Sequence, residues 1–125
     1  MSREKRVGDV RVWRIYDAAA PAGRVFFVER LWPRGIRRDQ LPAGAWVKDV
    51  APSTELRRWY GHDEAKWEEF RRRYVRELDA NPQGWRPLLE AARTQDLVLG
   101  YSARDEDHNS ALVLRDYLLH HLRTG

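Results

Sequence analysis

The amino-acid sequence predicts an α/β fold, a small three-layer sandwich in which helices flank a short, mostly parallel sheet. Three observations indicate this class. Apolar, β-rich segments cover residues 10–16, 25–28 and 97–103. Amphipathic helical patterns occupy the long stretch between the second and third of these segments. Another helical pattern follows the third segment, so that strand, polar loop and helix succeed one another as in α/β proteins.

The first two strands are predicted from different patterns. Residues 10–16 read Val-Arg-Val-Trp-Arg-Ile-Tyr, an alternation typical of a half-exposed strand. Residues 25–28 form a continuous apolar run, which is typical of a strand buried on both faces. The connection over residues 17–23 is short for a parallel crossover, so a hairpin between these two strands stays open.

Four helices are predicted in the remainder of the chain. A short one opens at residues 52–54 (Pro-Ser-Thr) and continues through Trp59, and Asp63 is a suitable N-cap for a second. The third begins at Asn81–Pro82, because proline fits the first helical position. The stripes expected to face the core are Trp67, Phe70, Tyr74 and Leu78, then Trp85, Leu88, Leu89 and Ala92, and in the last helix Leu114, Tyr117, Leu118 and Leu122. The pairs expected at i,i+4 on the second helix are Glu68 with Arg72 and Glu69 with Arg73.

Length and composition exclude several classes of protein. The 125 residues suit a single domain, expected over residues 1–125 with an ordered core from about 10 to 122. The absence of cysteine excludes a disulfide scaffold, a cysteine-based zinc site and a thiol nucleophile. No apolar run approaches the roughly 20 residues that span a bilayer, and the polar start lacks a signal-peptide core, so we expect a cytoplasmic protein. Walker, dinucleotide-binding and nucleophile-elbow patterns do not occur.

Basic residues are concentrated in the first third of the chain. The 23 Lys and Arg exceed the 19 Asp and Glu and give a net charge of +4. Residues 1–48 hold 11 of the basic and 5 of the acidic residues, and the density is highest at Arg30, Arg34, Arg37 and Arg38 around Trp32. Such a positive field attracts an anionic partner, although a solvated loop in an arginine-rich proteome has the same composition.

Two segments share one design, an apolar strand that ends abruptly in polar residues, at 29–35 and at 102–109. If the two strands are neighbours in a parallel sheet, both loops meet at one edge beside the start of the last helix. Arg30, Arg34 and Arg104 would form an anion site there, since a guanidinium binds carboxylate or phosphate oxygens in pairs.

His108 is the candidate general acid or base, and Asp105 is the carboxylate that would orient it. Asp105 and Asn109 are equally suited to cap the last helix. Asp105 or Glu29 would also be the partner of Arg30, if that arginine only neutralises a buried charge.

Other side chains have both a structural and a functional interpretation. The Tyr101 hydroxyl, at a strand end, either reaches a ligand or lies in the core. Trp32 either stacks on a ring or wedges its loop against the core. Ser53 is expected to be a helix cap rather than a nucleophile. A hard-metal cluster is resembled by Asp105, Asp107 and His108, yet calcium-loop and zinc-site spacings are missing, so neither a metal nor a cofactor is predicted.

Four motifs resemble the YeaO-like branch of the domain-of-unknown-function 488 family. They lie at residues 29–35 (Glu-Arg-Leu-Trp-Pro-Arg-Gly), 46–57, 59–63 and 103–109. The resemblance implies an α/β fold in a cytoplasmic bacterial or archaeal protein without an established activity. It adds as candidate site residues Lys48, Ser53, Trp59 and His62. Two positions depart from the family pattern, because Glu29 stands where Asp is usual and Ser110 where His is frequent. The Cys-His-Arg motif of more distant relatives is absent, so their thiol chemistry does not carry over.

The sequence therefore predicts a protein that binds, or acts on, a small anionic or phosphorylated molecule at the carboxyl ends of its strands. Arg30, Arg34 and Arg104 would hold the anion, and His108 with Asp105 would transfer protons. The alternative is a nucleic-acid-binding domain that uses the basic first third without catalysis, and a third reading is an interaction module without a ligand. The oligomeric state, and whether the protein is an enzyme, stay open.

Overall fold

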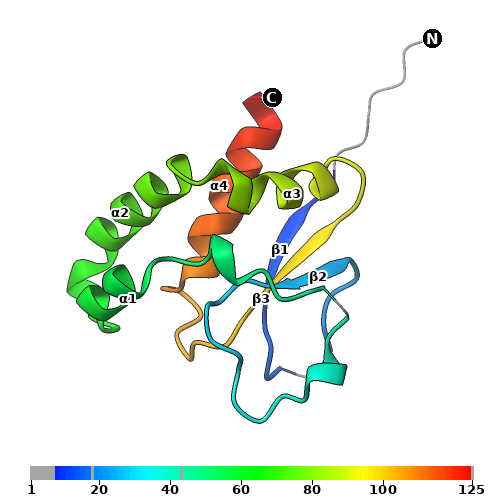
Figure 1. The fold of residues 1–125 in the computed structure, drawn as a ribbon, viewed down its shortest axis with the longest axis horizontal. Coiled ribbons are helices and arrows are strands. Elements are labelled where there is room, and N and C mark those ends of the chain that lie inside the picture. Colours follow the sequence, from blue (N-terminus) through cyan, green and yellow to red (C-terminus); the bar gives the residue numbers. More distant parts are fainter. Residues whose placement is uncertain (1–7, 18, 43, 125) are drawn as a thin grey trace.

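The three strands form one parallel sheet with the last strand in the middle. The computed structural model describes residues 8–17, 19–42 and 44–124. Strands β1 (Val10–Arg14) and β2 (Arg24–Phe27) both pair with β3 (Leu97–Tyr101), in the order β1-β3-β2. All three strands therefore end at the same edge of the sheet (Figure 1). The predicted small α/β fold with a short parallel sheet is confirmed.

The hairpin that the short connection left open between β1 and β2 does not form. The two strands are separated by β3, and each runs parallel to it. β3 suits the central place because it has no charged side chain and can be buried along its whole length, whereas β1 and β2 include the exposed Arg11 and Arg24. The chain enters β2 at Gly23, whose φ of +139° and missing side chain let the backbone approach Asp96 closely. The Arg24 N–H donates to the Asp96 carbonyl there at 2.8 Å.

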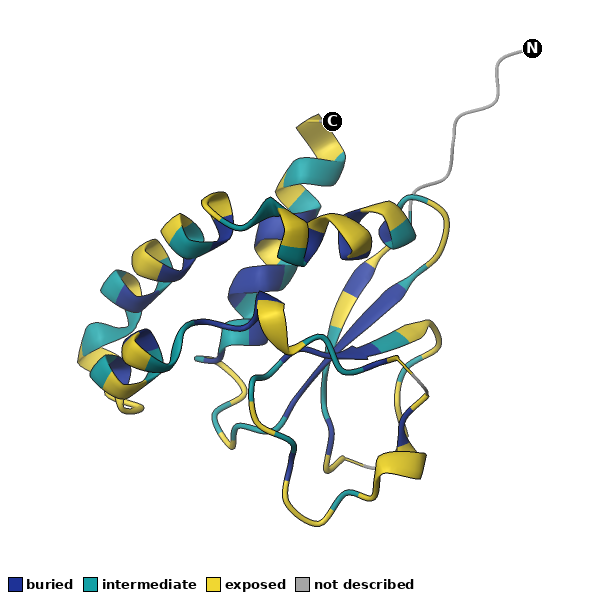
Figure 2. Ribbon diagram, viewed as in Figure 1, coloured by how far each residue is buried: buried dark blue, intermediate teal, exposed yellow. Residues whose placement is uncertain are grey.

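Helices cover one face of the sheet. They are α1 (Thr54–Tyr60), α2 (Trp67–Asp79), α3 (Pro82–Ala92) and α4 (Ser110–Thr124). Their apolar stripes join Val10, Leu97 and Leu99 of the sheet in one core (Figure 2). The predicted stripe residues are buried there, apart from Trp67 and Leu122, which are partly buried. The helical spacing of apolar residues thus identified the core-facing side of each helix.

The opposite face of the sheet is covered by the long loop after β2 and not by a helix. The described part of this loop contains two short 3-10 turns, Arg38–Gln40 and Lys48–Val50. Its side chains Trp32, Leu41 and Trp46 pack with Phe27 in a second, smaller core. The rings of Trp32 and Trp46 meet edge to face, with 5.3 Å between their centroids. Aromatic side chains on an irregular chain therefore form the third layer of the sandwich.

Local features differ in small ways from the prediction. β1 and β3 each end two residues earlier than predicted. On α2, Glu69 pairs with Arg73 as predicted, at 2.9 Å, and also with Arg72 at 3.0 Å. Glu68 pairs with Arg71 at 3.2 Å and not with Arg72, because Arg72 is already bound by Glu69.

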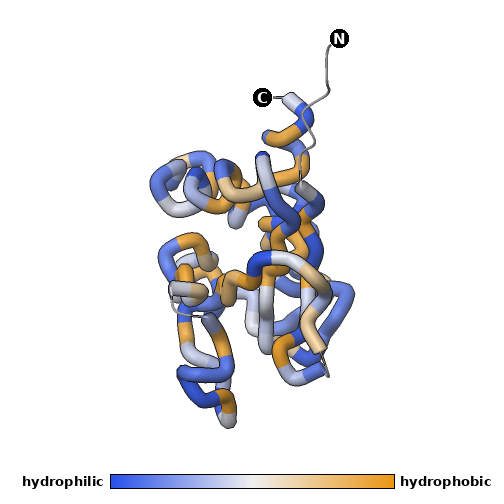
Figure 3. Tube along the Cα trace, turned by 90° about the vertical axis from the view of Figure 1, so that its right-hand side faces the viewer, coloured by the Kyte–Doolittle hydropathy of each residue, from blue (hydrophilic) through white to orange (hydrophobic). Residues whose placement is uncertain are grey.

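Hydropathy changes repeatedly along the chain, without one long hydrophobic stretch (Figure 3). Even α4, with 15 residues, carries the exposed Asp116 and His120 among its apolar side chains. None of the helices in the described ranges is long and apolar enough to cross a membrane.

Candidate functional site

Side-chain hydrogen bonds tie together the loops that follow the three strands. The Glu29 carboxylate, after β2, accepts bonds from the N–H of Ser102 at 2.9 Å and from its hydroxyl at 2.5 Å. The Nε of Arg14, at the end of β1, donates to the Ala103 carbonyl at 2.9 Å. The sequence predicted that the loops after β2 and β3 meet, and these bonds bring their first residues together.

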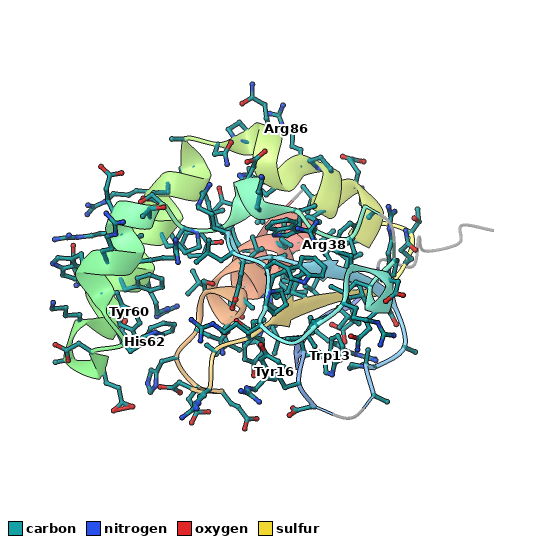
Figure 4. All side chains as sticks on the ribbon, turned by 60° about the horizontal axis from the view of Figure 1, so that its bottom comes forward. Trp13, Tyr16, Arg38, Tyr60, His62 and Arg86 are labelled. Atoms are coloured by element: carbon teal, nitrogen blue, oxygen red, sulfur yellow. The ribbon has the colours of Figure 1, made fainter. Side chains whose placement is uncertain are left out.

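Arg34 and Arg104 have exposed side chains beside these contacts. The Tyr16 hydroxyl, labelled in Figure 4, donates to the Arg34 carbonyl at 2.7 Å. The Arg14 guanidinium lies over the Tyr16 ring, 5.0 Å from its centroid. One chain of contacts therefore runs from Ala103, next to Arg104, through Arg14 and Tyr16 to Arg34. Within the described residues, neither exposed guanidinium is held by a hydrogen bond or an ion pair.

Arg14 and Tyr16 were not among the predicted site residues, because their alternating pattern assigned them to a strand. The alternation continues to Tyr16, so no sequence signal showed that β1 ends at Arg14 and places this charge at the edge where ligands bind in α/β sheets. Acidic side chains lie at this edge as well. Burial raises the pKa of the Tyr101 hydroxyl, the carboxylates of Glu106 and Asp17 raise it further, and the Arg14 guanidinium opposes them. Tyr101 itself is 3% exposed and belongs to the core.

Arg30 is bound to the main chain in front of α1. Its Nη2 donates to the Ala51 carbonyl at 3.1 Å and its Nε to the Pro52 carbonyl at 3.3 Å. Among the described residues no ion pair joins Arg30 to Glu29 or Asp105, so the charge pairing weighed from the sequence is not seen. The bonds satisfy carbonyls that follow a 3-10 turn. A part for Arg30 in an anion site stays a prediction.

Asp105 and His108 lie together in the loop before α4, as a pair. The Asp105 Oδ2 is 3.0 Å from the His108 Nδ1, while its Oδ1 accepts the main-chain N–H groups of Asp107 at 2.9 Å and His108 at 3.1 Å. The bond from Asp107, followed by those from His108, holds the pKa of Asp105 below its ordinary value. Asn109 caps α4, because its Oδ1 accepts the Leu112 N–H at 3.1 Å. Asp105 therefore orients the imidazole and Asn109 starts the helix.

Residues from the end of α1, the following turn and the start of α2 complete this cluster, and none of them was predicted to belong to it. The Glu64 Oε1 lies 3.4 Å from the His108 Nδ1. The Trp67 ring meets the imidazole of His108 edge to face, with 5.2 Å between centroids. Burial raises the pKa of Tyr60, and the nearby carboxylates of Asp105 and Glu64 raise it further. No sequence pattern signals this meeting, since it depends on the packing of α2 against α4.

The other residues that the resemblance adds lie at separate places. His62 is exposed in the turn between α1 and α2 (Figure 4), with a left-handed φ of 60°. Lys48 is exposed, with its Nζ 5.2 Å from the centroid of the Trp46 ring. Trp59 lies under the guanidinium of Arg73, at 4.0 Å. Trp59 lines a groove together with Ser53, and neither Lys48 nor His62 lines that groove.

Ser53 is the N-cap of α1, as predicted. Its Oγ accepts an N–H of the first turn at 3.1 Å, and the Glu77 carboxylate accepts the Ser53 N–H at 2.8 Å and hydroxyl at 2.6 Å. A groove of about 440 Å³ adjoins this pair between α1 and α2, and another of about 430 Å³ lies between α2 and α4. Neither groove is lined by Arg34, Arg104 or His108.

Trp32 holds its loop against the sheet. Its indole N–H donates to the Ile36 carbonyl at 2.7 Å. Its ring contacts the rings of Phe27 and Trp46 edge to face, and the Arg38 guanidinium lies 4.5 Å from its centroid. This geometry supports the wedge interpretation, because the ring is already in contact with two rings and a cation.

Comparison with known proteins leads to uncharacterised relatives. Residues 9–125 match the family model DUF488-N3i, described as the inactive DUF488-N3 subclade. The uncharacterized protein YeaO of Escherichia coli is 39% identical over 111 residues, which cover 88% of this chain and 96% of that protein. The uncharacterized proteins Mb3100c of Mycobacterium bovis and Rv3073c of Mycobacterium tuberculosis are each 49% identical over 79 residues, which cover 62% of this chain and 64% of theirs. No solved structure matches the chain significantly.

Proposed function

We propose that this protein, which belongs to the DUF488-N3i family of YeaO-like proteins, binds a small anionic or phosphorylated molecule at the carboxyl edge of its sheet without transforming it. The guanidiniums of Arg34 and Arg104 are the binding groups. Binding is favoured over catalysis because the matching subclade is described as inactive. The Asp105–His108 pair is then not required for proton transfer.

The observation that carries this proposal is the chain of contacts through Arg14 and Tyr16. Arg14 is bonded to the Ala103 carbonyl and Tyr16 to the Arg34 carbonyl, so the backbone beside both exposed arginines is held in place. A binding group on a fixed backbone loses less conformational freedom when a ligand arrives. Guanidiniums bind phosphate and carboxylate oxygens through paired, charge-assisted hydrogen bonds.

Mixed charge at this edge favours a small anion over a nucleic acid. The carboxylates of Glu106 and Asp17 act on Tyr101 from the same region, so a long polyanion would meet repulsion together with attraction. In the nucleic-acid alternative Trp32 would stack on a base, but Ile36 and Arg38 already engage its ring system. A compact anion needs only the two guanidiniums. It neither extends over the carboxylates nor requires the Trp32 ring to leave its present contacts.

Isothermal titration of the full chain with inorganic phosphate, sulfate and a set of phosphorylated metabolites tests the proposal. Arg34→Ala and Arg104→Ala should each weaken the best ligand roughly three- to tenfold, the effect of losing about 1 kcal/mol at an exposed charged contact. Arg86→Ala is the matched control, because Arg86 is exposed on α3, well away from Tyr16 in Figure 4. The control should bind as the wild type does.

His108→Ala separates binding from catalysis at this edge. If the protein only binds the anion through its arginines, this variant keeps the wild-type affinity, and the bound ligand is recovered unchanged after long incubation. Chemical conversion of the ligand by the wild type but not by His108→Ala would contradict the proposal. Equal affinities for wild type, Arg34→Ala and Arg104→Ala would do so as well.

A further inference from the structure

Two carboxylates and one imidazole converge where the turn between α1 and α2 meets the loop before α4. One donor atom each from Glu64, Asp105 and His108 lies within 4.8 Å of the others. The His108 Nδ1 is 3.0 Å from the Asp105 Oδ2 and 3.4 Å from the Glu64 Oε1. Donor atoms around an ion with bonds of about 2.1 Å stand roughly 3.0–3.5 Å apart, the edge of an octahedron or a tetrahedron. Both contacts of the histidine fall in that range.

The proton of an imidazole cannot satisfy this arrangement by itself. Both carboxylates face the same nitrogen, Nδ1, and the single hydrogen that this nitrogen can carry points fully at only one of them. Lys66, the cation of the same turn, donates its Nζ to the Trp59 carbonyl at 2.8 Å. Glu64 and Asp105 are not paired with any Lys or Arg of the described ranges.

The raised pKa of Tyr60 also indicates excess negative charge at this place. After burial, the carboxylates of Asp105, Glu64 and Asp63 are the groups that raise its pKa, and no cation opposes them among the causes resolved there. Carboxylates gathered here without a paired Lys or Arg in the described ranges form a centre that attracts a cation.

We infer that Glu64, Asp105 and His108 bind a divalent transition-metal ion of the zinc or manganese class. One imidazole nitrogen with two carboxylate oxygens suits these ions, whereas calcium prefers six to eight oxygen ligands. Water would fill the remaining positions. The ion would join the turn before α2 to the loop before α4.

The surroundings already orient two of the three ligands. The Oδ1 of Asp105 is held by main-chain N–H groups, and the His108 ring rests against Trp67. The ion would replace the hydrogen between the Asp105 Oδ2 and the His108 Nδ1 and bind both atoms. Metal ligands in proteins are commonly oriented by such outer contacts. Glu64 is the exposed ligand, so its side chain can close on the ion by rotation.

Calorimetric titration of the untagged protein with ZnCl₂ and with MnCl₂ tests the inference. We expect one Zn²⁺ per chain, bound more tightly than Mn²⁺. His108→Ala and Glu64→Gln should each weaken Zn²⁺ at least about tenfold. His120→Ala, which removes an exposed histidine of α4 outside the cluster, should leave the affinity unchanged.

Thermal melting provides the second readout. A fixed concentration of Zn²⁺ that saturates the wild type should raise the melting temperature of the wild type and of His120→Ala equally and that of Glu64→Gln by less, because an ion bound only to the folded state stabilises it according to its affinity. Absence of saturable Zn²⁺ binding by the wild type would overturn the inference. The same holds if His108→Ala and Glu64→Gln bind Zn²⁺ as tightly as the wild type. The anion proposal depends on Arg34 and Arg104 and is unaffected by either result.

Discussion

The carboxylate of Glu29 accepts both polar hydrogens of Ser102, the N–H at 2.9 Å and the hydroxyl at 2.5 Å. Glu29 follows the edge strand β2, and Ser102 follows the central strand β3. Beyond this pair of residues the two segments separate: the one after β2 continues into the loop layer, and the one after β3 continues into α4. This pair of bonds therefore fixes the point at which the two loops of the candidate site part.

Ser102→Ala removes the hydroxyl and leaves the carboxylate of Glu29 with one of its two bonds. Hydrogen bonds to charged groups contribute about 1.5–3 kcal/mol, so the free energy of unfolding should fall by about 1–3 kcal/mol. Urea denaturation measures this change. Ser110→Ala, at the start of α4, is the control and should change stability by less than about 0.5 kcal/mol. Equal stability of both variants would show that the Glu29–Ser102 contact contributes nothing.

Tyr74 lies in the core with 1% of its surface exposed, and its hydroxyl donates to the Val50 carbonyl at 2.7 Å. Burial is the main cause that raises the pKa of this phenol, so the hydroxyl stays protonated and remains a donor. Tyr74→Phe leaves a buried carbonyl without its partner and should cost about 1–3 kcal/mol in chemical denaturation. Tyr16→Phe removes the hydroxyl of an exposed tyrosine, and we expect its stability to be within about 0.5 kcal/mol of the wild type.

Glu69 receives hydrogen bonds from Arg73 and Arg72, which lower its pKa below the ordinary 4.5. A carboxyl with a lowered pKa stabilises the folded state above its ordinary pKa and loses that contribution as the pH falls through the lowered value. The stability of the wild type should therefore exceed that of Glu69→Gln at pH 7, and the two should converge in strong acid. Denaturation curves at several pH values measure the difference. A difference that grows toward acid pH would contradict the assignment, and added salt should reduce the difference at neutral pH.

Trp32 joins the loop layer to the sheet through Phe27 and Trp46. Trp32→Ala should loosen this layer while the helical core on the other face keeps its packing, because the two cores consist of different residues. Hydrogen exchange would then become faster in residues 30–41 and stay close to wild-type rates in α2 and α4. A uniform loss of protection over the whole chain would show instead that the two faces unfold as one unit.

Much of the fold could be predicted because its signals are local. The spacing of Phe70, Tyr74 and Leu78 identifies the buried side of α2 without knowledge of what covers it. Ser53 was predicted to be a cap from its place before a helix, and it is one. The order of the strands was not determined by such signals. A short connection permits a hairpin, and only the apolar character of β3, far along the chain, places that strand between the other two.

In the candidate site, too, some residues could be predicted from local signals and others only from the folded structure. Asp105 and His108 are three positions apart in one loop, so the sequence alone placed them together, and it also marked Arg34 and Arg104 as charges that follow buried strands. Arg14 and Glu64 gained their places only in the folded chain. Arg14 reaches Ala103 because β1 and β3 are in parallel register, and Glu64 reaches His108 because α2 packs against α4. Local periodicity determines which face of an element is buried, but contacts between distant segments form only when those faces are packed together.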